Sequence, residues 1–145
     1  RRTAEQYERS FRDRLDANRI NEAASFNEGL RLLLRTLIDV HREQRPFLAA
    51  TEIEVLSNLT EYSGLAESVD VRSLMESDSR PVTDALQALL DAHPEENLAL
   101  SGRETTTVKV IDVLIHRFVY FEPLFGSEQD FTDALTKITR ALLTP

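Results

Sequence analysis

The sequence predicts an all-α protein, an orthogonal bundle of about six helices. Apolar residues recur at spacings of three and four along most of the chain, which is the period of a helix that buries one face. Only four glycines and five prolines occur, and most of them fall between the periodic segments. No linker, repeat or low-complexity stretch divides residues 1–145, so we expect a single domain.

Three helices are predicted in the first half of the chain. Residues 3–20 have a narrow apolar stripe, so this helix must lie against another element. The capping box Ser25-Phe-Asn-Glu28 begins a second helix, which continues to about residue 41 and has the broad apolar face of a helix at the centre of a bundle. A third helix begins at Pro46 and ends near Gly64. Residues 65–80 give no clear prediction.

The next helix begins at Pro81 and ends at the His93-Pro94 step. Residues 94–103 are predicted as a loop, which a second capping box, Ser101-Gly-Arg-Glu104, closes. Val, Ile and Phe are frequent after residue 104 and also favour a strand. The length of the segment, its capping signal and its lack of strict alternation favour a helix.

The last two helices carry more apolar surface than one small core requires. Val108, Ile111, Ile115 and Phe118 share one face of the first, while other apolar residues occupy a second face. Because a helix that is apolar on two faces needs two partners, we expect one face to meet the core and the other to meet a second subunit. Gly126 separates this helix from the last one, which Ser127 and Asp130 cap.

Composition excludes several classes of protein. There is no cysteine, which excludes a disulfide scaffold and a thiolate metal site. Residues 1–45 hold ten arginines against eight acidic residues, whereas residues 46–145 hold seven basic and seventeen acidic residues. The acidic body repels phosphate backbones. The excess of arginine at the beginning is compatible with an anionic neighbour, but pairing of these arginines with neighbouring acids along a helix is the favoured interpretation. No apolar run approaches the ~20 residues of a membrane span, and we expect a cytoplasmic location.

We find no pattern for catalysis, a cofactor or a metal. His41, His93 and His116 lie on different predicted segments, and none forms a metal-binding pair. Asp112 lies one turn before His116 and could bond to it, which leaves an all-α enzyme as an open alternative. There is no phosphate-binding loop or nucleophile elbow. We therefore predict that the chain is not an enzyme.

A bundle of this kind can enclose an apolar pocket between its helices. For each apolar candidate, packing in a solid core is the competing interpretation, because stripes at helical spacing are usually core. The residues predicted to bind a ligand are Phe26, Asn27, Leu30, Leu34, Ile53, Leu56, Tyr62, Leu86, His116 and Phe118.

The order of these segments resembles the carboxy-terminal regulatory domain of TetR-family transcriptional repressors. FRDRLDANRI resembles the family's linker helix, followed by LRLLLRTLIDVHREQRP and FLAATEIEVL. VKVIDVLIHRFVYFEPLFG and SEQDFTDALTKITRALL resemble its final two helices. The resemblance covers nearly all 145 residues and depends on helix order and apolar texture.

The resemblance implies a four-helix homodimer interface, a small apolar effector, and DNA release when that effector binds. The family's helix-turn-helix would precede residue 1, and the segment 1–20 would lead toward it, so DNA binding would need a domain outside this chain. A ligand-free helical interaction or scaffold domain is the alternative. The residues implied at the dimer interface are Val110, Val113, Leu114, Arg117, Phe121, Phe131, Leu135, Ile138 and Leu142.

Overall fold

The computed structural model describes residues 2–43, 80–120 and 126–145, and within these ranges all regular structure is helical. These ranges also contain two short 3₁₀ turns, η1 (Ile20–Glu22) and η2 (Pro94–Glu96). The all-α prediction is confirmed for the described residues. The long helices are α1 (Arg2–Asn18), a helix over residues 26–43 referred to below as the central helix, α4 (Arg80–Ala92), α5 (Glu104–Tyr120) and α6 (Glu128–Leu143).

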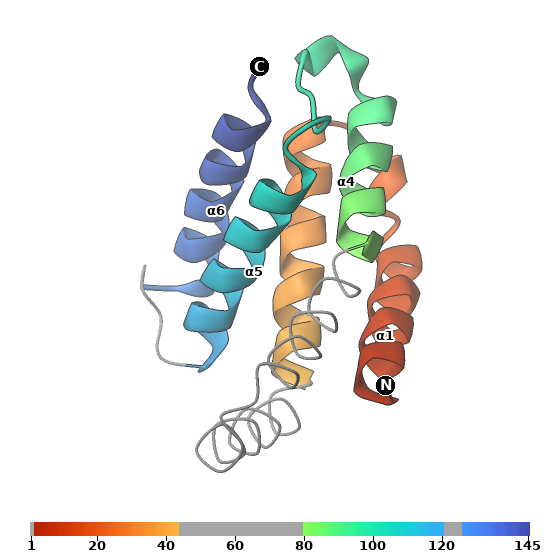
Figure 1. Ribbon diagram of the computed structural model, residues 1–145, viewed down its shortest axis with the longest axis vertical. Helices are drawn as coiled ribbons and strands as arrows, with labels where there is room; N and C mark the ends of the chain where they lie inside the picture. The colour runs from red at the N-terminus through yellow and green to blue at the C-terminus, as the bar shows by residue number, and fades with distance from the viewer. Residues whose placement is uncertain (1, 44–79, 121–125) are drawn as a thin grey trace, which may run out of the picture.

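The central helix lies between two pairs of helices. Figure 1 shows α5 and α6 on one side of it and α1 and α4 on the other. On the α6 side, Arg31 Nη2 lies 3.3 Å from Asp133 Oδ1. On the α1 side, Ser10 Oγ donates to Glu43 Oε2 at 3.3 Å. The broad apolar face predicted for this helix is thus covered from several directions.

Gly29 allows the central helix to lie very close to α4. A Cβ atom placed on Gly29 would be 2.5 Å from Cδ2 of Leu89, a fully buried side chain of α4. Glycine is unfavourable inside a helix by roughly 0.5–1 kcal/mol relative to alanine. The close approach therefore explains why a glycine occupies this buried position near the beginning of the central helix.

The core is formed by large aliphatic and aromatic side chains from every long helix that the structure describes. Their interior packing is the main source of stability in a domain of this size. The fully buried ones with the largest volumes are Phe11, Phe26, Phe131, Leu30, Leu33, Leu34, Ile38, Leu86, Leu89, Leu100, Ile111 and Ile115.

Two of the predicted helix caps are confirmed. Glu28 N–H donates to Ser25 Oγ at 3.2 Å, and Asp130 N–H donates to Ser127 Oγ at 3.1 Å. Each serine accepts a bond from a backbone N–H that has no partner within its helix. These caps place the beginnings of the central helix and of α6 where the sequence predicted them.

The predicted cap at Ser101 is wrong. Thr107 N–H donates to Arg103 O at 2.9 Å, so Arg103 is the residue that precedes α5. Gly102, with a φ of 81°, lies in the turn before it. The loop predicted over 94–103 contains η2, and the helix predicted from Pro46 to Gly64 lies outside the described residues.

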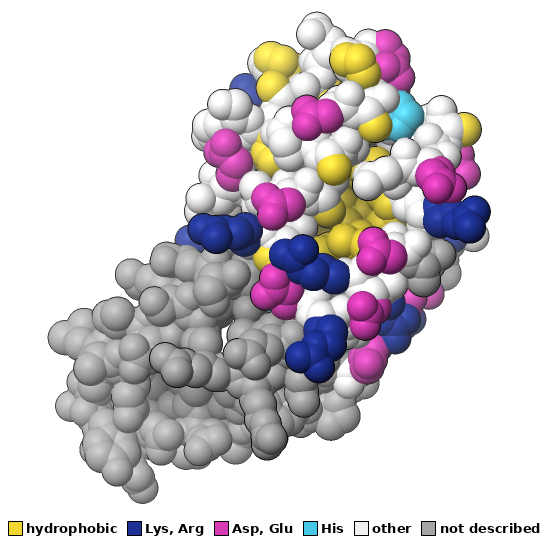
Figure 2. Space-filling view, turned by 90° about the vertical axis from the view of Figure 1, so that its right-hand side faces the viewer, with side chains coloured by type: hydrophobic (Ala, Val, Ile, Leu, Met, Phe, Trp, Pro, Cys, Tyr) yellow, Lys and Arg dark blue, Asp and Glu magenta, His cyan; other side chains and the backbone are white. Residues whose placement is uncertain are grey.

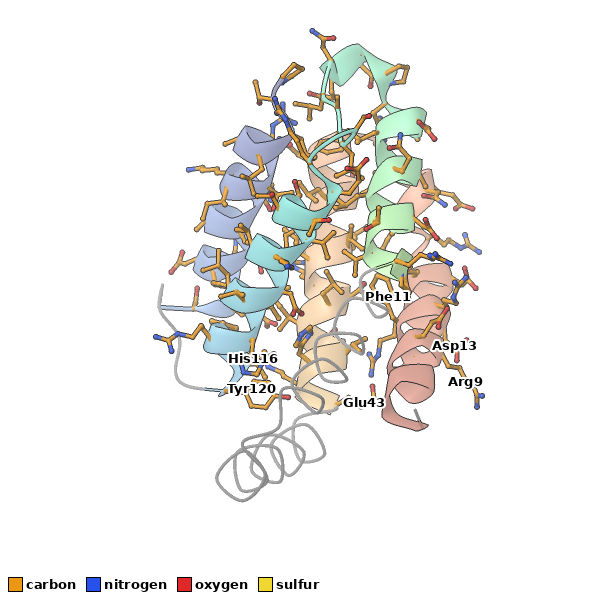
Figure 3. The ribbon with its side chains drawn as sticks, viewed as in Figure 1. Arg9, Phe11, Asp13, Glu43, His116 and Tyr120 are labelled. Atoms are coloured by element: carbon orange, nitrogen blue, oxygen red, sulfur yellow. The ribbon has the colours of Figure 1, made fainter. Side chains whose placement is uncertain are left out.

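The predicted 3–20 helix corresponds largely to α1, whose described side chains make both apolar and polar contacts with the bundle. Phe11 is fully buried, whereas Arg9 and Asp13 point away from the bundle (Figure 3). Arg14 Nη2 donates to Glu43 Oε2 of the central helix. The hydrogen bond from Arg14 holds the pKa of Glu43 below its ordinary value, and the positive charge of Arg14 and the bond from Ser10 add to this effect.

Candidate functional site

The α5–α6 pair carries apolar side chains on the side that faces away from the central helix. Val113 is 57% exposed, and no other large hydrophobic side chain among the described residues is classed as exposed. Its neighbours on both helices are half-buried. We refer to these residues as the outer face: Val110, Val113 and Leu114 of α5 with Ala134, Ile138 and Leu142 of α6.

The orientation of α5 follows from Asp112. Its Oδ1 atom lies 3.2 Å from Nε2 of His41, so Asp112 points toward the central helix. Val110 and Leu114 each lie two residues from Asp112 along the chain. At 3.6 residues per turn, both are therefore about 160° around the helix from it. These two side chains accordingly point away from the central helix.

The orientation of α6 follows from Arg140 in the same way. Its Nη1 atom donates to Oδ1 of Asn27 at 2.8 Å, so Arg140 faces the central helix. Ile138 and Leu142 each lie two residues from Arg140, which again places them about 160° around the helix. The two helices thus present their aliphatic residues in the same direction.

Threonines occupy the inner side of α6. Thr132, Thr136 and Thr139 are 1%, 3% and 0% exposed. Thr132 Oγ1 donates to Glu128 O at 2.8 Å, and Thr136 Oγ1 donates to Thr132 O at 2.7 Å. Bonds of this kind to the preceding turn satisfy a buried hydroxyl. Because threonines fill the inner side, part of the aliphatic stripe of α6 is turned toward the outer face.

The C-terminal end of α6 is fixed by contacts that cross from the segment before α5. Arg103 Nη1 donates to Leu142 O at 3.0 Å and also to Thr144 O. Ala99 N–H donates to Leu143 O at 2.9 Å. These bonds satisfy carbonyl groups that a helix end leaves without partners. They hold the C-terminal part of the outer face in a defined position.

The residues predicted for a dimer interface lie in different surroundings in the structure. Phe131 and Leu135 are 0% and 1% exposed and pack in the core of this single chain. Arg117 is exposed, and Phe121 lies outside the described residues. The others belong to the outer face: Val110, Val113, Leu114, Ile138 and Leu142.

The residues predicted to bind a ligand are also divided. Asn27 is exposed and accepts the bond from Arg140. His116 is half-buried, and its ring stacks on Tyr120 with centroids 4.4 Å apart. Ile53, Leu56 and Tyr62 lie outside the described residues. The remaining five are buried in the core: Phe26, Leu30, Leu34 and Leu86 at 0% exposure and Phe118 at 5%.

Asp112 pairs with His41 and not with His116, the partner that the sequence suggested. The Nδ1 atom of His41 donates to Leu37 O at 2.8 Å, and its Nε2 atom faces Asp112. The side chain of His41 is 6% exposed and that of Asp112 is 47% exposed. No spacing rule could have found this pair, because 71 residues separate its members. It joins the central helix to α5.

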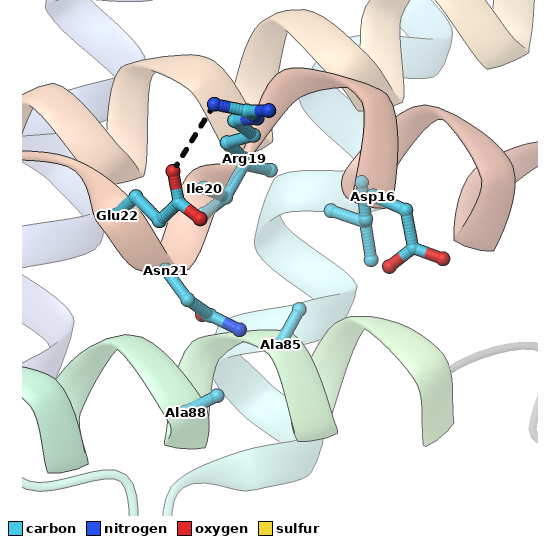
Figure 4. A pocket seen from close by; sticks show the side chains of 8 residues that line it. Asp16, Arg19, Ile20, Asn21, Glu22, Ala85 and Ala88 are labelled. Carbon is cyan, nitrogen blue, oxygen red and sulfur yellow. Dashed lines mark ion pairs between the residues drawn. The ribbon is translucent and has the colours of Figure 1, made fainter.

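A groove runs between α1 with η1 and α4, and sequence analysis did not predict it. Two hollows of about 270 and 170 Å³ lie here, and they adjoin at Leu15 and Ala85, which line both. Figure 2 faces this side of the molecule and shows apolar side chains at the bottom of a hollow with charged ones around it; Figure 4 shows the larger hollow closely. The residues of this α1–α4 groove are Arg12, Leu15, Asp16, Arg19, Ile20, Asn21, Glu22, Pro81, Asp84, Ala85 and Ala88.

Within residues 2–43, 80–120 and 126–145, no three His, Cys, Asp or Glu side chains gather in a way that could hold a metal ion. None of the helices in those ranges has the length and hydrophobicity needed to cross a membrane.

No protein-family model matches this chain, and neither the curated proteins nor the solved structures compared with it include a match.

Proposed function

We propose that this chain is the effector-sensing and dimerisation domain of a TetR-like transcriptional repressor. The proposal includes an orthogonal bundle of about six helices, a homodimer, and a small apolar effector held between helices. DNA binding would belong to a separate domain beyond α1. The observation that carries the proposal is the outer face, where the exposed Val113 is surrounded by half-buried aliphatic side chains of two adjacent helices.

The outer face has the composition of an interface between identical subunits. Its centre is aliphatic, and three exposed cationic side chains border it: Lys109 and Arg117 on α5 and Lys137 on α6. Interfaces characteristically combine an apolar centre with a polar rim. A two-fold axis across this face would bring α5 and α6 against their copies and cover Val113 on both subunits. The result would be a bundle of four helices.

The effector would act by favouring one arrangement of the helices over another. A ligand shifts such an equilibrium only when it binds the two arrangements with different affinities. Helix α1 is suited to report the shift because Phe11 inserts into the core and Arg14 bonds to the end of the central helix. Movement of the central helix would therefore displace α1.

A ligand-free interaction or scaffold domain is the second candidate, and the packing of the core favours it. Phe26, Leu30, Leu34 and Leu86 are all 0% exposed. The approach of Leu89 to Gly29 shows that the central helix and α4 leave no room even for a methyl group at that point. A solid core of this kind does not need an effector.

Dimerisation is tested by placing a charge in the outer face. Val113→Glu should convert a dimer into a monomer in sedimentation equilibrium while the far-UV circular dichroism spectrum is unchanged, because Val113 is 57% exposed. Thr105→Glu is the matched control: it adds the same charge at an exposed position in the first turn of α5, where an acid is tolerated. A wild-type monomer, or a Val113→Glu dimer of unchanged affinity, would contradict the proposal.

Effector sensing is tested separately by thermal denaturation of the wild-type dimer with a panel of small apolar compounds. A ligand that binds only the folded state raises the melting temperature as its concentration increases. A saturable increase supports the repressor domain. A dimer that no compound stabilises supports the interaction domain.

A further inference from the structure

The α1–α4 groove lies on a different part of the molecule from the outer face, and its shape suits a peptide. Each of its two hollows, about 270 and 170 Å³, is below the roughly 300–1,000 Å³ typical of small-molecule pockets. They adjoin at Leu15 and Ala85, so together they form a row of two hollows along the space between the helices. Such an arrangement accommodates successive side chains along one face of a docked helix.

The bottom of the groove is apolar. Leu15 is half-buried, and Ile20 is 4% exposed. On α4, Pro81, Ala85 and Ala88 line the groove and follow one another at spacings of four and three, so they share one face of that helix. Because alanine has no side chain beyond Cβ, a second helix could approach α4 closely along this line.

The two arginines of the groove already have acidic partners. Arg12 donates to Glu8 Oε1 from both Nε at 3.1 Å and Nη2 at 2.9 Å. Arg19 Nη1 lies 3.7 Å from Glu22 Oε2, the ion pair marked in Figure 4. Arg80, the single basic residue of α4, is not among the residues that line the groove. The positive charges of this region are therefore largely compensated.

The remaining carboxylates are not compensated. Asp16 lies on the α1 wall and Asp84 on the α4 wall, and neither forms an ion pair within the described part of the chain. An apolar groove flanked on both sides by unpaired carboxylates is complementary to an aliphatic stripe flanked by cations. Complementary charges of this kind fix the orientation of a partner and increase the rate of association.

We propose that the α1–α4 groove binds a cationic amphipathic helix of a partner protein. One or two aliphatic side chains of that helix would enter the groove between Leu15 and Ala88, while lysines or arginines beside them would approach Asp16 and Asp84. The contact area is small and the ion pairs are exposed to water, so the complex is transient and weakened by salt. The proposal is independent of dimerisation through the outer face.

The test uses two synthetic, fluorescein-labelled helical peptides and fluorescence anisotropy at low salt. One peptide carries leucines along one face and lysines beside them; the other has glutamates in place of the lysines. The wild-type chain should bind the first saturably and the second at least tenfold more weakly. Absence of binding to the lysine peptide, or equal binding of both peptides, would overturn the proposal.

Variants then locate the binding. Ala88→Phe fills the groove and should weaken binding of the lysine peptide at least tenfold. Asp16→Asn/Asp84→Asn keeps the shape of both side chains and should weaken binding about three- to tenfold, as expected for two exposed ion pairs. Asp39→Asn/Glu104→Gln is the matched control, since it removes the same charge from other helices and should change affinity less than twofold.

Each outcome has a definite meaning. If Asp39→Asn/Glu104→Gln weakens binding as much as Asp16→Asn/Asp84→Asn does, the peptide is attracted to the acidic surface in general and the proposal fails. If Ala88→Phe is folded by circular dichroism and binds normally, the groove is not the site. If Ala88→Phe does not fold, the two double variants alone decide. Val113→Glu should bind the peptide normally, which separates this result from that of the dimer test.

Discussion

The phenyl rings of Phe118 and Phe131 are stacked, with centroids 4.2 Å apart and planes inclined by 1°. They join the C-terminal part of α5 to the N-terminal part of α6. Arg42 of the central helix covers the same corner: its Cζ atom lies 5.8 Å from the Phe118 centroid, and its Nη1 atom donates to Glu128 Oε1 at 2.9 Å. Three helices therefore meet at one aromatic pair.

Replacing Phe131 by alanine should lower the free energy of unfolding by about 3–5 kcal/mol, because the side chain is completely buried and the cavity would fill only in part. Urea denaturation followed by circular dichroism, at one fixed protein concentration, measures the change. Phe131→Leu retains most of the volume and should cost less than half as much. Thr105→Ala, at an exposed position, should change stability by less than about 0.5 kcal/mol.

Gly29→Ala should also destabilise the fold, although alanine is the better helix former by roughly 0.5–1 kcal/mol. The added Cβ would meet Leu89 Cδ2 at 2.5 Å, and overpacking of this kind costs about 1–3 kcal/mol. The same measurement of unfolding tests this change.

Leu89→Ala provides the control for Gly29. In that background the obstructing methyl group is absent, so Gly29→Ala should become neutral or stabilising. A Gly29→Ala protein more stable than the wild type would show that the close approach does not exist in solution.

Much of the fold was predictable because its signals are local. Ser25 and Ser127 each lie three residues before the N–H group that they cap, so their roles follow from short-range geometry. Ser101 has the same spacing to Glu104, yet the chain turns at Gly102 and Arg103 instead precedes the helix. A capping sequence shows that a cap is possible, and the adjoining turn decides whether it forms.

The sites were less predictable because an aliphatic stripe in a sequence is normally interpreted as the buried face of a helix. In α6, threonines such as Thr136 fill part of the inner side with hydroxyls bonded to the preceding turn, a use of threonine that hydrophobicity patterns do not indicate. Phe131 and Leu135 pack in the core, while Ile138 and Leu142 on the same stripe remain half-exposed. The α1–α4 groove depends on two helices that are distant in sequence, so no local pattern could reveal it.

Stability should depend on pH through Glu43. Since its pKa is lowered in the folded chain by the bond from Arg14, its contribution is present above the pKa of the unfolded state and is lost as the pH falls through the folded value. Both side chains are partly exposed, so the contribution is less than about 1 kcal/mol. The free energy of unfolding of the wild type should exceed that of Glu43→Gln at pH 7. This difference, measured by urea denaturation, should become smaller as the pH is lowered to 3.

Arg14→Ala tests the cause of this pH dependence. In the Arg14→Ala protein, Glu43→Gln should change the free energy of unfolding at pH 7 much less than it does in the wild type, because the main cause of the lowered pKa of Glu43 is gone. If the difference in free energy of unfolding between the wild type and Glu43→Gln increased as the pH falls, its sign would be opposite to that expected for a lowered pKa of Glu43.

Asp112 should be coupled energetically to His41 and not to His116. Its carboxylate lies 3.2 Å from Nε2 of the nearly buried His41, whereas the ring of His116 stacks on Tyr120. A double-mutant cycle of Asp112→Ala with His41→Gln should give a coupling free energy of about 1 kcal/mol, while the cycle with His116→Ala should give one near zero. Urea denaturation at pH 6 measures both cycles. If the larger coupling belonged to His116, the one-turn pair would be the real one, and the link between the central helix and α5 would need another explanation.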